Sequence, residues 1–113
     1  MASTATSRVL QAITAEREAQ TRQWGVQHHA DSDGDLYLET YEGLATAYKT
    51  LNTGALASGH DPSWPLILLE EVYEALAEGA NPEALEKELI QVGAVCVAWV
   101  EDLRSRSGRA TAE

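Results

Sequence analysis

Four glutamates crowd one short stretch of this chain, at Glu70, Glu71, Glu74 and Glu78, and no lysine or arginine occurs within residues 65–86 to balance them. On a helix, like charges three and four residues apart repel by roughly 0.2–0.5 kcal/mol per pair. A bound cation would offset this repulsion, because carboxylate oxygens are the preferred ligands of hard cations such as Mg²⁺ and Mn²⁺. The stretch is therefore a candidate metal site.

Two further oxygen-bearing side chains, Glu88 and Gln91, follow a short turn. At a rise of about 1.5 Å per residue, Glu74 and Glu71 lie roughly 7 and 12 Å before the turn, whereas Glu88 and Gln91 lie about 9 and 14 Å beyond it. Each pair is spaced three apart, so its members project from neighbouring positions on their helix. The spacing predicts a site between two antiparallel helices.

The turn itself is predicted by Gly79, Asn81 and Pro82, which are typical of a helix stop, an N-cap and a first-turn proline. Before the turn, the predicted buried face of the helix and its glutamates point in opposite directions, a pattern that by itself favours a solvated acidic face. After the turn, residues 89–100 are apolar nearly all round, which predicts a helix buried on every side. Glu88 shares a face with apolar residues there, and a buried carboxylate needs a partner.

Helical periodicity extends over most of the chain and places these side chains in an all-α fold. The predicted helices cover residues 7–24, about 36–58, about 64–78 and 82–103, with Asp61 or Ser63 as the cap of the third. The apolar stripe of the second is Tyr37, Tyr41, Leu44, Tyr48, Leu51 and Ala55; that of the third is Leu69, Val72, Tyr73 and Leu76. We expect one domain over 7–103, a disordered N-terminus at 1–6 and a flexible tail at 104–113.

Composition narrows the classes of function. The 113 residues are 44% hydrophobic and 23% charged, and their formal net charge of −10 argues against a protein that binds nucleic acid through a basic face. No stretch approaches the roughly 20 apolar residues of a membrane span, and the N-terminal sequence lacks the apolar run of a signal peptide. Cys96 is the only cysteine, so no internal disulfide is expected. We expect a cytoplasmic protein with no nucleic-acid or membrane partner.

The hairpin resembles the MazG-like nucleoside triphosphate pyrophosphohydrolases, whose pattern is EExxE followed by ExxD. Glu70, Glu71 and Glu74 match the first motif and Glu88 opens the second, whereas Gln91 stands where the family has aspartate. The segments WPLILLEEVYEALAE, LEKELIQVGAVCVAWVEDL and EREAQTRQWGVQHHAD look like short phage and actinobacterial members, so the resemblance covers residues 15 to 103.

The resemblance implies a four-helix bundle with a metal-binding hairpin, assembled as a homodimer or homotetramer. It also implies cleavage between the α and β phosphates of a nucleoside triphosphate, which yields the monophosphate and pyrophosphate, with Mg²⁺ as cofactor and Mn²⁺ as a substitute. By analogy with phage members, the expected substrate is a purine nucleotide, dGTP or dATP, in preference to dUTP or dCTP. A phage protein would act in the host cytoplasm. Under this reading the metal ligands are Glu71, Glu74, Glu88 and, weakly or through water, Gln91, while Glu70 orients the attacking water or supports the ligands.

Substrate contacts are expected from two groups of residues. Trp24, Gln27 and His28 combine an aromatic face with polar edges, as a nucleobase pocket requires, although a tryptophan at the end of a helix is more often part of the core. Lys49 and Lys87 are candidate phosphate contacts, although a lone lysine on a helix is usually solvated. His28, His29 and Asp31 also suggest a transition-metal site, but adjacent histidines diverge and chelate poorly.

Residues 31–42 support a rival interpretation as a calcium loop. Asp31, Asp33, Asp35 and Glu42 occupy positions one, three, five and twelve of such a loop, but Leu36 stands where it needs glycine. The second helix is expected to begin at about Leu36, so Asp33 or Asp35 serves better as its N-cap. A third interpretation is a catalytically inactive helical partner protein, suggested by Gln91.

Overall fold

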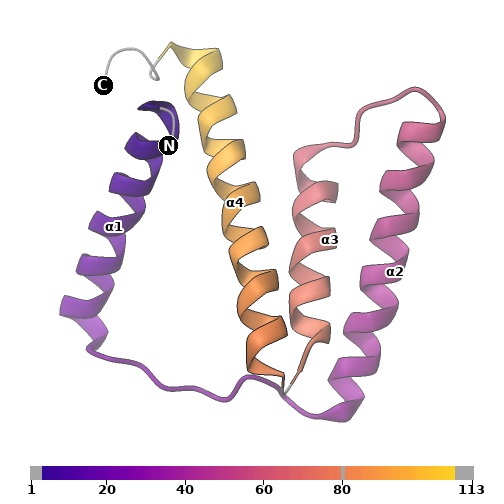
Figure 1. Ribbon diagram of the computed structural model, residues 1–113, viewed down its shortest axis with the longest axis horizontal. Coiled ribbons are helices and arrows are strands. Elements are labelled where there is room, and N and C mark those ends of the chain that lie inside the picture. Colours follow the sequence, from indigo (N-terminus) through magenta and orange to yellow (C-terminus); the bar gives the residue numbers. More distant parts are fainter. Residues whose placement is uncertain (1–3, 80, 109–113) are drawn as a thin grey trace. The chain divides into compact units, whose positions relative to one another are not determined.

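The computed structural model describes residues 4–79 and 81–108, and these residues form helices joined by turns and loops, with no strand among them. The helices are α1 (Thr4–Trp24), α2 (Asp35–Ala57), α3 (Trp64–Ala77) and α4 (Pro82–Ser107), shown in chain order in Figure 1. The predicted all-α class is therefore confirmed. Within the described ranges, no helix combines the length and apolarity that a membrane crossing requires.

Helix boundaries follow local capping chemistry. The Ser63 hydroxyl accepts a hydrogen bond from the Leu66 amide (3.3 Å) at the start of α3, and the Asn81 side chain accepts one from the Ala84 amide (3.2 Å) at the start of α4. Gly25, which follows α1, has a φ of 70°, a conformation that favours glycine and ends a helix. These three predicted boundaries are confirmed within one or two residues.

The start of α2 and the predicted chain ends differ from expectation. The N-cap of α2 is Gly34, at a φ of 115°, instead of Asp33 or Asp35, and its carbonyl accepts from the amides of Tyr37 and Leu38. α1 begins at Thr4, inside the terminus that was expected to be disordered. α4 continues to Ser107, inside the expected tail. The remaining parts of those two expectations, residues 1–3 and 109–113, lie outside the described residues.

The chain divides into two compact units where the sequence predicted one domain. One unit contains residues 30–95, with α2, α3 and the first half of α4. The other contains the described residues up to 29 and from 96 onward, where the Thr6 hydroxyl donates to Glu101 (3.1 Å) and Val9 and Val97 are buried.

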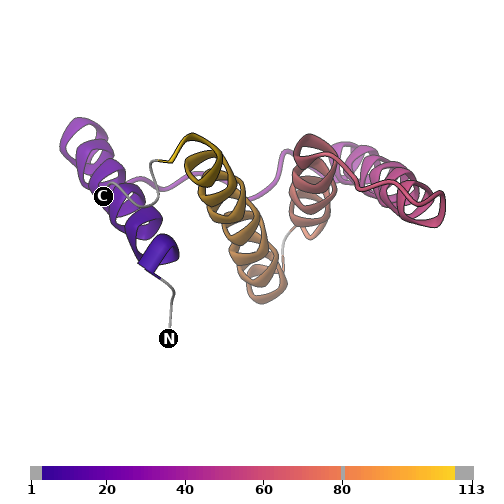
Figure 2. The same ribbon diagram turned by 90° about the horizontal axis from the view of Figure 1, so that it is seen from above.

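In the unit of residues 30–95, α2 and α3 pack side by side along their length, as both Figure 1 and Figure 2 show. The Tyr73 ring of α3 stacks on two rings of α2, at centroid distances of 6.3 Å from Tyr41 and 5.6 Å from Tyr48. Such aromatic pairs add to the stabilisation that burial provides. Ala75 of α3 is 1% exposed.

The turn between α3 and α4 depends on Gly79. Its φ is 63°, and a Cβ atom there would lie 3.0 Å from both terminal carbons of Leu38 on α2. Glycine avoids both the backbone strain and this close contact. The turn that brings α4 after α3 is therefore also the point where the hairpin contacts the start of α2.

One burial prediction was wrong, since Leu76, expected in the core of α3, is 38% exposed. The apolar pattern of α4 is that of a helix buried on every side, which 113 residues were not expected to bury alone. Within the single chain, Leu89 and Ile90 are 51% and 69% exposed, and Cys96 is exposed as well. The apolar pattern of α4 is thus only partly covered by the chain itself.

Candidate metal centre

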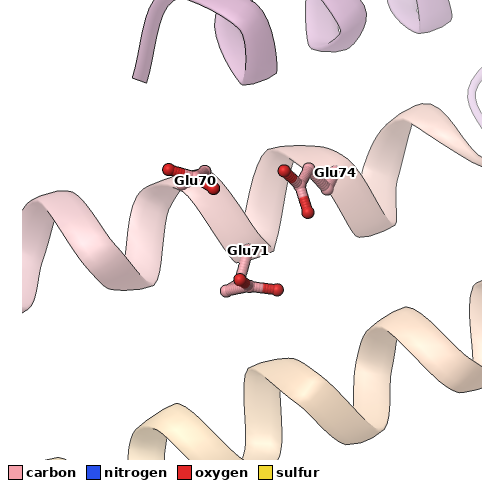
Figure 3. Close-up of side chains that lie close together, drawn as sticks. All are labelled: Glu70, Glu71 and Glu74. Carbon is pink, nitrogen blue, oxygen red and sulfur yellow. The ribbon is translucent and has the colours of Figure 1, made fainter. Parts of the chain in front are cut away.

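Three glutamates of α3 converge although they come from two sides of the helix. In Figure 3, Glu70 lies on the side of α3 that faces α2, whereas Glu71 projects from the opposite side. One carboxylate oxygen of each of Glu70, Glu71 and Glu74 lies within 4.8 Å of the others. All three side chains are half-buried, so they do not form the freely solvated face that the helical pattern alone also allowed. With Glu88 of α4, we call these residues the acidic cluster.

The strongest sign of an electropositive partner is a pair of buried oxygens that lack one. Oε2 of Glu71 and Oε2 of Glu88 are inaccessible to solvent and accept no hydrogen bond from any group that the structure describes. A buried carboxylate oxygen without a donor is costly, and such groups are normally paired with a cation or a metal. Glu70, Glu71 and Glu74 of α3 form the group whose oxygens could hold a divalent ion, and Glu88 of α4, which lies outside that group, acts on Glu71 and Glu74 through its charge.

Electrostatics within the cluster agree with this fit. Burial raises the pKa of Glu71 above its ordinary value, and the neighbouring charges of Glu70 and then Glu88 raise it further. Burial also raises the pKa of Glu74, as do Glu71, Glu70 and Glu88, while Lys49 acts in the opposite direction. Glu88 therefore acts on both α3 carboxylates across the hairpin. These groups repel one another when ionised, and a cation would relieve that repulsion.

Asn52, on α2, also contacts the cluster, and sequence reasoning missed it. Its Nδ2 donates to Oε1 of Glu70 at 2.9 Å and to the carbonyl of Leu66 at 3.0 Å. The available signal was its position, four residues after Tyr48 and three before Ala55, which places an amide beside the apolar stripe of the helix. A polar residue at such a position needs a partner on the neighbouring helix.

The remaining residues predicted near the phosphates and metal are more peripheral. Lys49 is exposed on α2 but close enough to Glu74 to influence its pKa. Lys87 and Gln91 are both exposed on α4, so neither side chain belongs to the buried part of the acidic cluster. Gln91 as a direct ligand stays a prediction.

Placing an aspartate at residue 91, as in the motif that the hairpin resembles, provides a test of that position. In Gln91→Asp, a negative charge is added one helical turn from Glu88, and we expect Mg²⁺ to bind about fivefold more tightly, which corresponds to about 1 kcal/mol between charges near a protein surface. Calorimetric titration with Mg²⁺ measures this change. Ala94→Asp, also exposed on α4 but one turn further on, is the control. An unchanged affinity in Gln91→Asp would place residue 91 away from the ion.

The predicted nucleobase residues lie in the other unit, and they do share a surface. Trp24, Gln27 and His28 line one shallow hollow together with Val26 and His29. Trp24 is 64% exposed, so it is not the core residue that its position at the end of a helix favoured. His29 Nε2 lies 3.4 Å from Oε1 of Gln27, and no metal-binding group that includes His28, His29 and Asp31 forms among the described residues.

The calcium-loop interpretation receives no support from the backbone. α2 begins at Asp35, so positions five to twelve of the proposed loop are already helical. A calcium loop instead needs these residues to wrap around the ion. Among residues 31–42 the structure gathers no group of three potential ligands.

Comparisons of the chain with protein-family models, with curated proteins and with solved structures found no match.

Proposed function

We propose that this protein is a Mg²⁺-dependent nucleoside triphosphate pyrophosphohydrolase. The observation that carries the proposal is the pair of buried oxygens without a partner, on Glu71 of α3 and Glu88 of α4, beside the group that Glu70, Glu71 and Glu74 form on α3. The resemblance of this hairpin to MazG-like enzymes supplies the reaction class. Mn²⁺ is expected to substitute for Mg²⁺, because both accept oxygen ligands in similar geometry.

The members of the acidic cluster divide two tasks in this proposal. The ion is held by Glu71, Glu74 and Glu88. Bound there, Mg²⁺ would screen the triphosphate, polarise the α-phosphorus and acidify a water molecule. Glu70 accepts a hydrogen bond from Asn52 with Oε1, which leaves its other oxygen to orient the attacking water and accept its proton.

Substrate binding is assigned to basic and aromatic residues. Lys49, which already acts electrostatically on Glu74, is proposed to meet phosphate oxygens, with Lys87 as a second contact. Trp24, Gln27 and His28 are proposed to contact the base, which we expect to be a purine.

A nucleotide panel tests the proposed activity. The chain is incubated with each canonical ribo- and deoxynucleoside triphosphate, with Mg²⁺, with Mn²⁺ or with chelator, and pyrophosphate and monophosphate are measured. We expect equal amounts of both products from at least one nucleotide, only when a divalent ion is present. Release of inorganic phosphate alone, or no product from any nucleotide, would contradict the proposal.

We also propose assembly as a homodimer or homotetramer, supported by the exposed apolar side chains of Leu89 and Ile90 on α4. The face of α4 around Trp99 and residues 92–95 is expected to pack in or near the interface. Light scattering should give at least twice the mass of the 12.2 kDa chain at micromolar concentration. A compact monomer would contradict this assembly.

A further inference from the structure

Asn52 is a buried amide of α2 whose two hydrogen-bond partners lie on α3. It is 7% exposed and is the buried polar residue of the described part of the chain. Its neighbours one turn away on α2, Tyr48 and Ala55, contribute apolar surface to the same region. Burying an amide costs free energy unless the amide forms hydrogen bonds.

The hydrogen bonds of Asn52 fix the orientation of its amide. Both partners of Nδ2, the Leu66 carbonyl at 3.0 Å and Oε1 of Glu70 at 2.9 Å, are acceptors. Rotation of the amide by 180° would place Oδ1 against two oxygens, so this orientation is strongly preferred. Oδ1 itself is buried and receives no hydrogen bond from the described residues. The residue therefore satisfies its donors and leaves its acceptor unpaired.

The two hydrogen bonds donated by Nδ2 of Asn52 connect groups one turn apart on α3. Leu66 and Glu70 are four residues apart, so Asn52 ties the Glu70 carboxylate to the backbone of its own helix. Glu70 lies on the side of α3 that faces α2 (Figure 3). In this position, one of its carboxylate oxygens still lies within 4.8 Å of a carboxylate oxygen of Glu71 and of Glu74. The Asn52 bond holds one of its oxygens and so limits rotation about the side-chain bonds.

We propose that Asn52 is a positioning residue, which holds the Glu70 carboxylate in the orientation that completes the acidic cluster. The inference rests on the proposed function for what that orientation achieves in catalysis. Loss of a side chain that orients a metal-site group typically lowers activity or metal affinity by about 10- to 100-fold. We expect this loss in kcat, with a much smaller change in KM, because Asn52 contacts Glu70 and not the substrate.

Asn52→Leu removes both donors of the amide and its unpaired acceptor. Loss of the bond to Oε1 of Glu70 destabilises the folded protein and loss of the unpaired Oδ1 offsets part of that cost, so kcat and metal affinity, and not the melting temperature, separate positioning from a structural role. A residue that only joined α2 to α3 would leave the kcat and Mn²⁺ affinity of the folded variant unchanged. Thr46→Leu, at an exposed position on α2, is the control, and it should leave kcat and metal affinity unchanged.

A double-mutant cycle with Glu70→Ala tests whether Asn52 acts through Glu70. Both kcat and Mn²⁺ affinity by calorimetric titration are measured for the wild type, Asn52→Leu, Glu70→Ala and the double variant. We expect the double variant to match Glu70→Ala in both quantities, because the residue that Asn52 orients is already absent. The inference would be overturned if the fold-changes of the two single variants multiplied in the double variant. It would also be overturned if Asn52→Leu had the kcat and Mn²⁺ affinity of the wild type.

The cycle also distinguishes this inference from the proposed function. Should the wild type hydrolyse no nucleotide, the proposed function fails, and the Mn²⁺ affinities alone then decide whether Asn52 acts through Glu70. If the wild type hydrolyses nucleotide but the effects of the two substitutions multiply in the double variant, the proposed function stands and the role of Asn52 is refuted. A wild-type chain that binds no Mn²⁺ refutes both.

Discussion

Replacing Glu74 by glutamine is expected to abolish hydrolysis while the metal-free protein remains as stable as the wild type or becomes more stable. Glutamine keeps the size of the side chain and removes its charge. Glu74 is half-buried among like charges, and burial together with Glu71, Glu70 and Glu88 already raises its pKa. Neutralising it relieves that repulsion, so the free energy of unfolding without metal should not fall.

The expected loss of activity is large because Glu74 is a proposed ligand of the ion. Substitution of groups that only orient metal ligands costs about 10- to 100-fold, so we expect a decrease in kcat of at least about 100-fold for a ligand itself. Added Mg²⁺ should also stabilise the variant less. An ion that binds only the folded state stabilises it by RT ln(1 + [L]/Kd), about 2.7 kcal/mol at 100 times Kd, and a weaker site reduces this term.

Glu78→Gln is the matched control for Glu74→Gln. Glu78 is the C-cap of α3, four residues after Glu74, and is also half-buried, but it is not part of the acidic cluster. Its substitution should change stability by no more than about 0.5 kcal/mol and leave the effect of Mg²⁺ intact. Thermal melts of the three proteins with and without Mg²⁺, beside a pyrophosphate assay, provide the comparison. Equal metal-induced shifts and near-normal turnover in Glu74→Gln would exclude Glu74 as a ligand.

Stability is expected to depend on pH in opposite directions with and without Mg²⁺. The pKa values of Glu71 and Glu74 are raised in the folded protein above the ordinary 4.5. The folded state therefore binds protons more readily than the unfolded chain, and this contribution to stability is complete below the unfolded pKa. It is lost as pH rises through the folded pKa values, so the metal-free protein should become less stable from about pH 4.5 upward through that window.

Metal binding reverses this trend because the ion binds only the ionised carboxylates. Its competition with protons weakens as pH rises, so the stabilisation that Mg²⁺ provides should grow over the same window. Melting temperatures measured at saturating Mg²⁺ and with chelator, at several pH values, give both trends. In Glu74→Gln both should be smaller, since one of the two titrating groups is absent. Stability of the metal-free wild type that rises with pH through this window would contradict the raised pKa values.

The sequence by itself determined the helices and most of their ends. Ser63, Asn81 and Gly25 act on backbone groups within four residues, so their effect can be read without knowledge of the fold. Helical spacing likewise places Glu70, Glu71 and Glu74 within about one turn of each other, but not the orientation of the Glu70 carboxylate, which Asn52 of α2 contacts. Gly34 is the exception at this level, because the backbone conformation of the preceding loop, and not the acidic side chains beside it, starts α2.

Only the tertiary structure decided which side chains are covered. Leu76, on the predicted buried face of α3, is 38% exposed, whereas Ala75, outside that predicted face, is 1% exposed, since periodicity gives the face of a helix but not what lies against it. The pairing of α2 with α3 brought Asn52 to Glu70 across 18 positions of the sequence. The hairpin likewise left Glu71 and Glu88 with buried oxygens that lack a partner. The burial of side chains and the pairing of helices depend on contacts between segments that are distant in the sequence. These contacts, together with the sequence, identify the acidic residues as a candidate site.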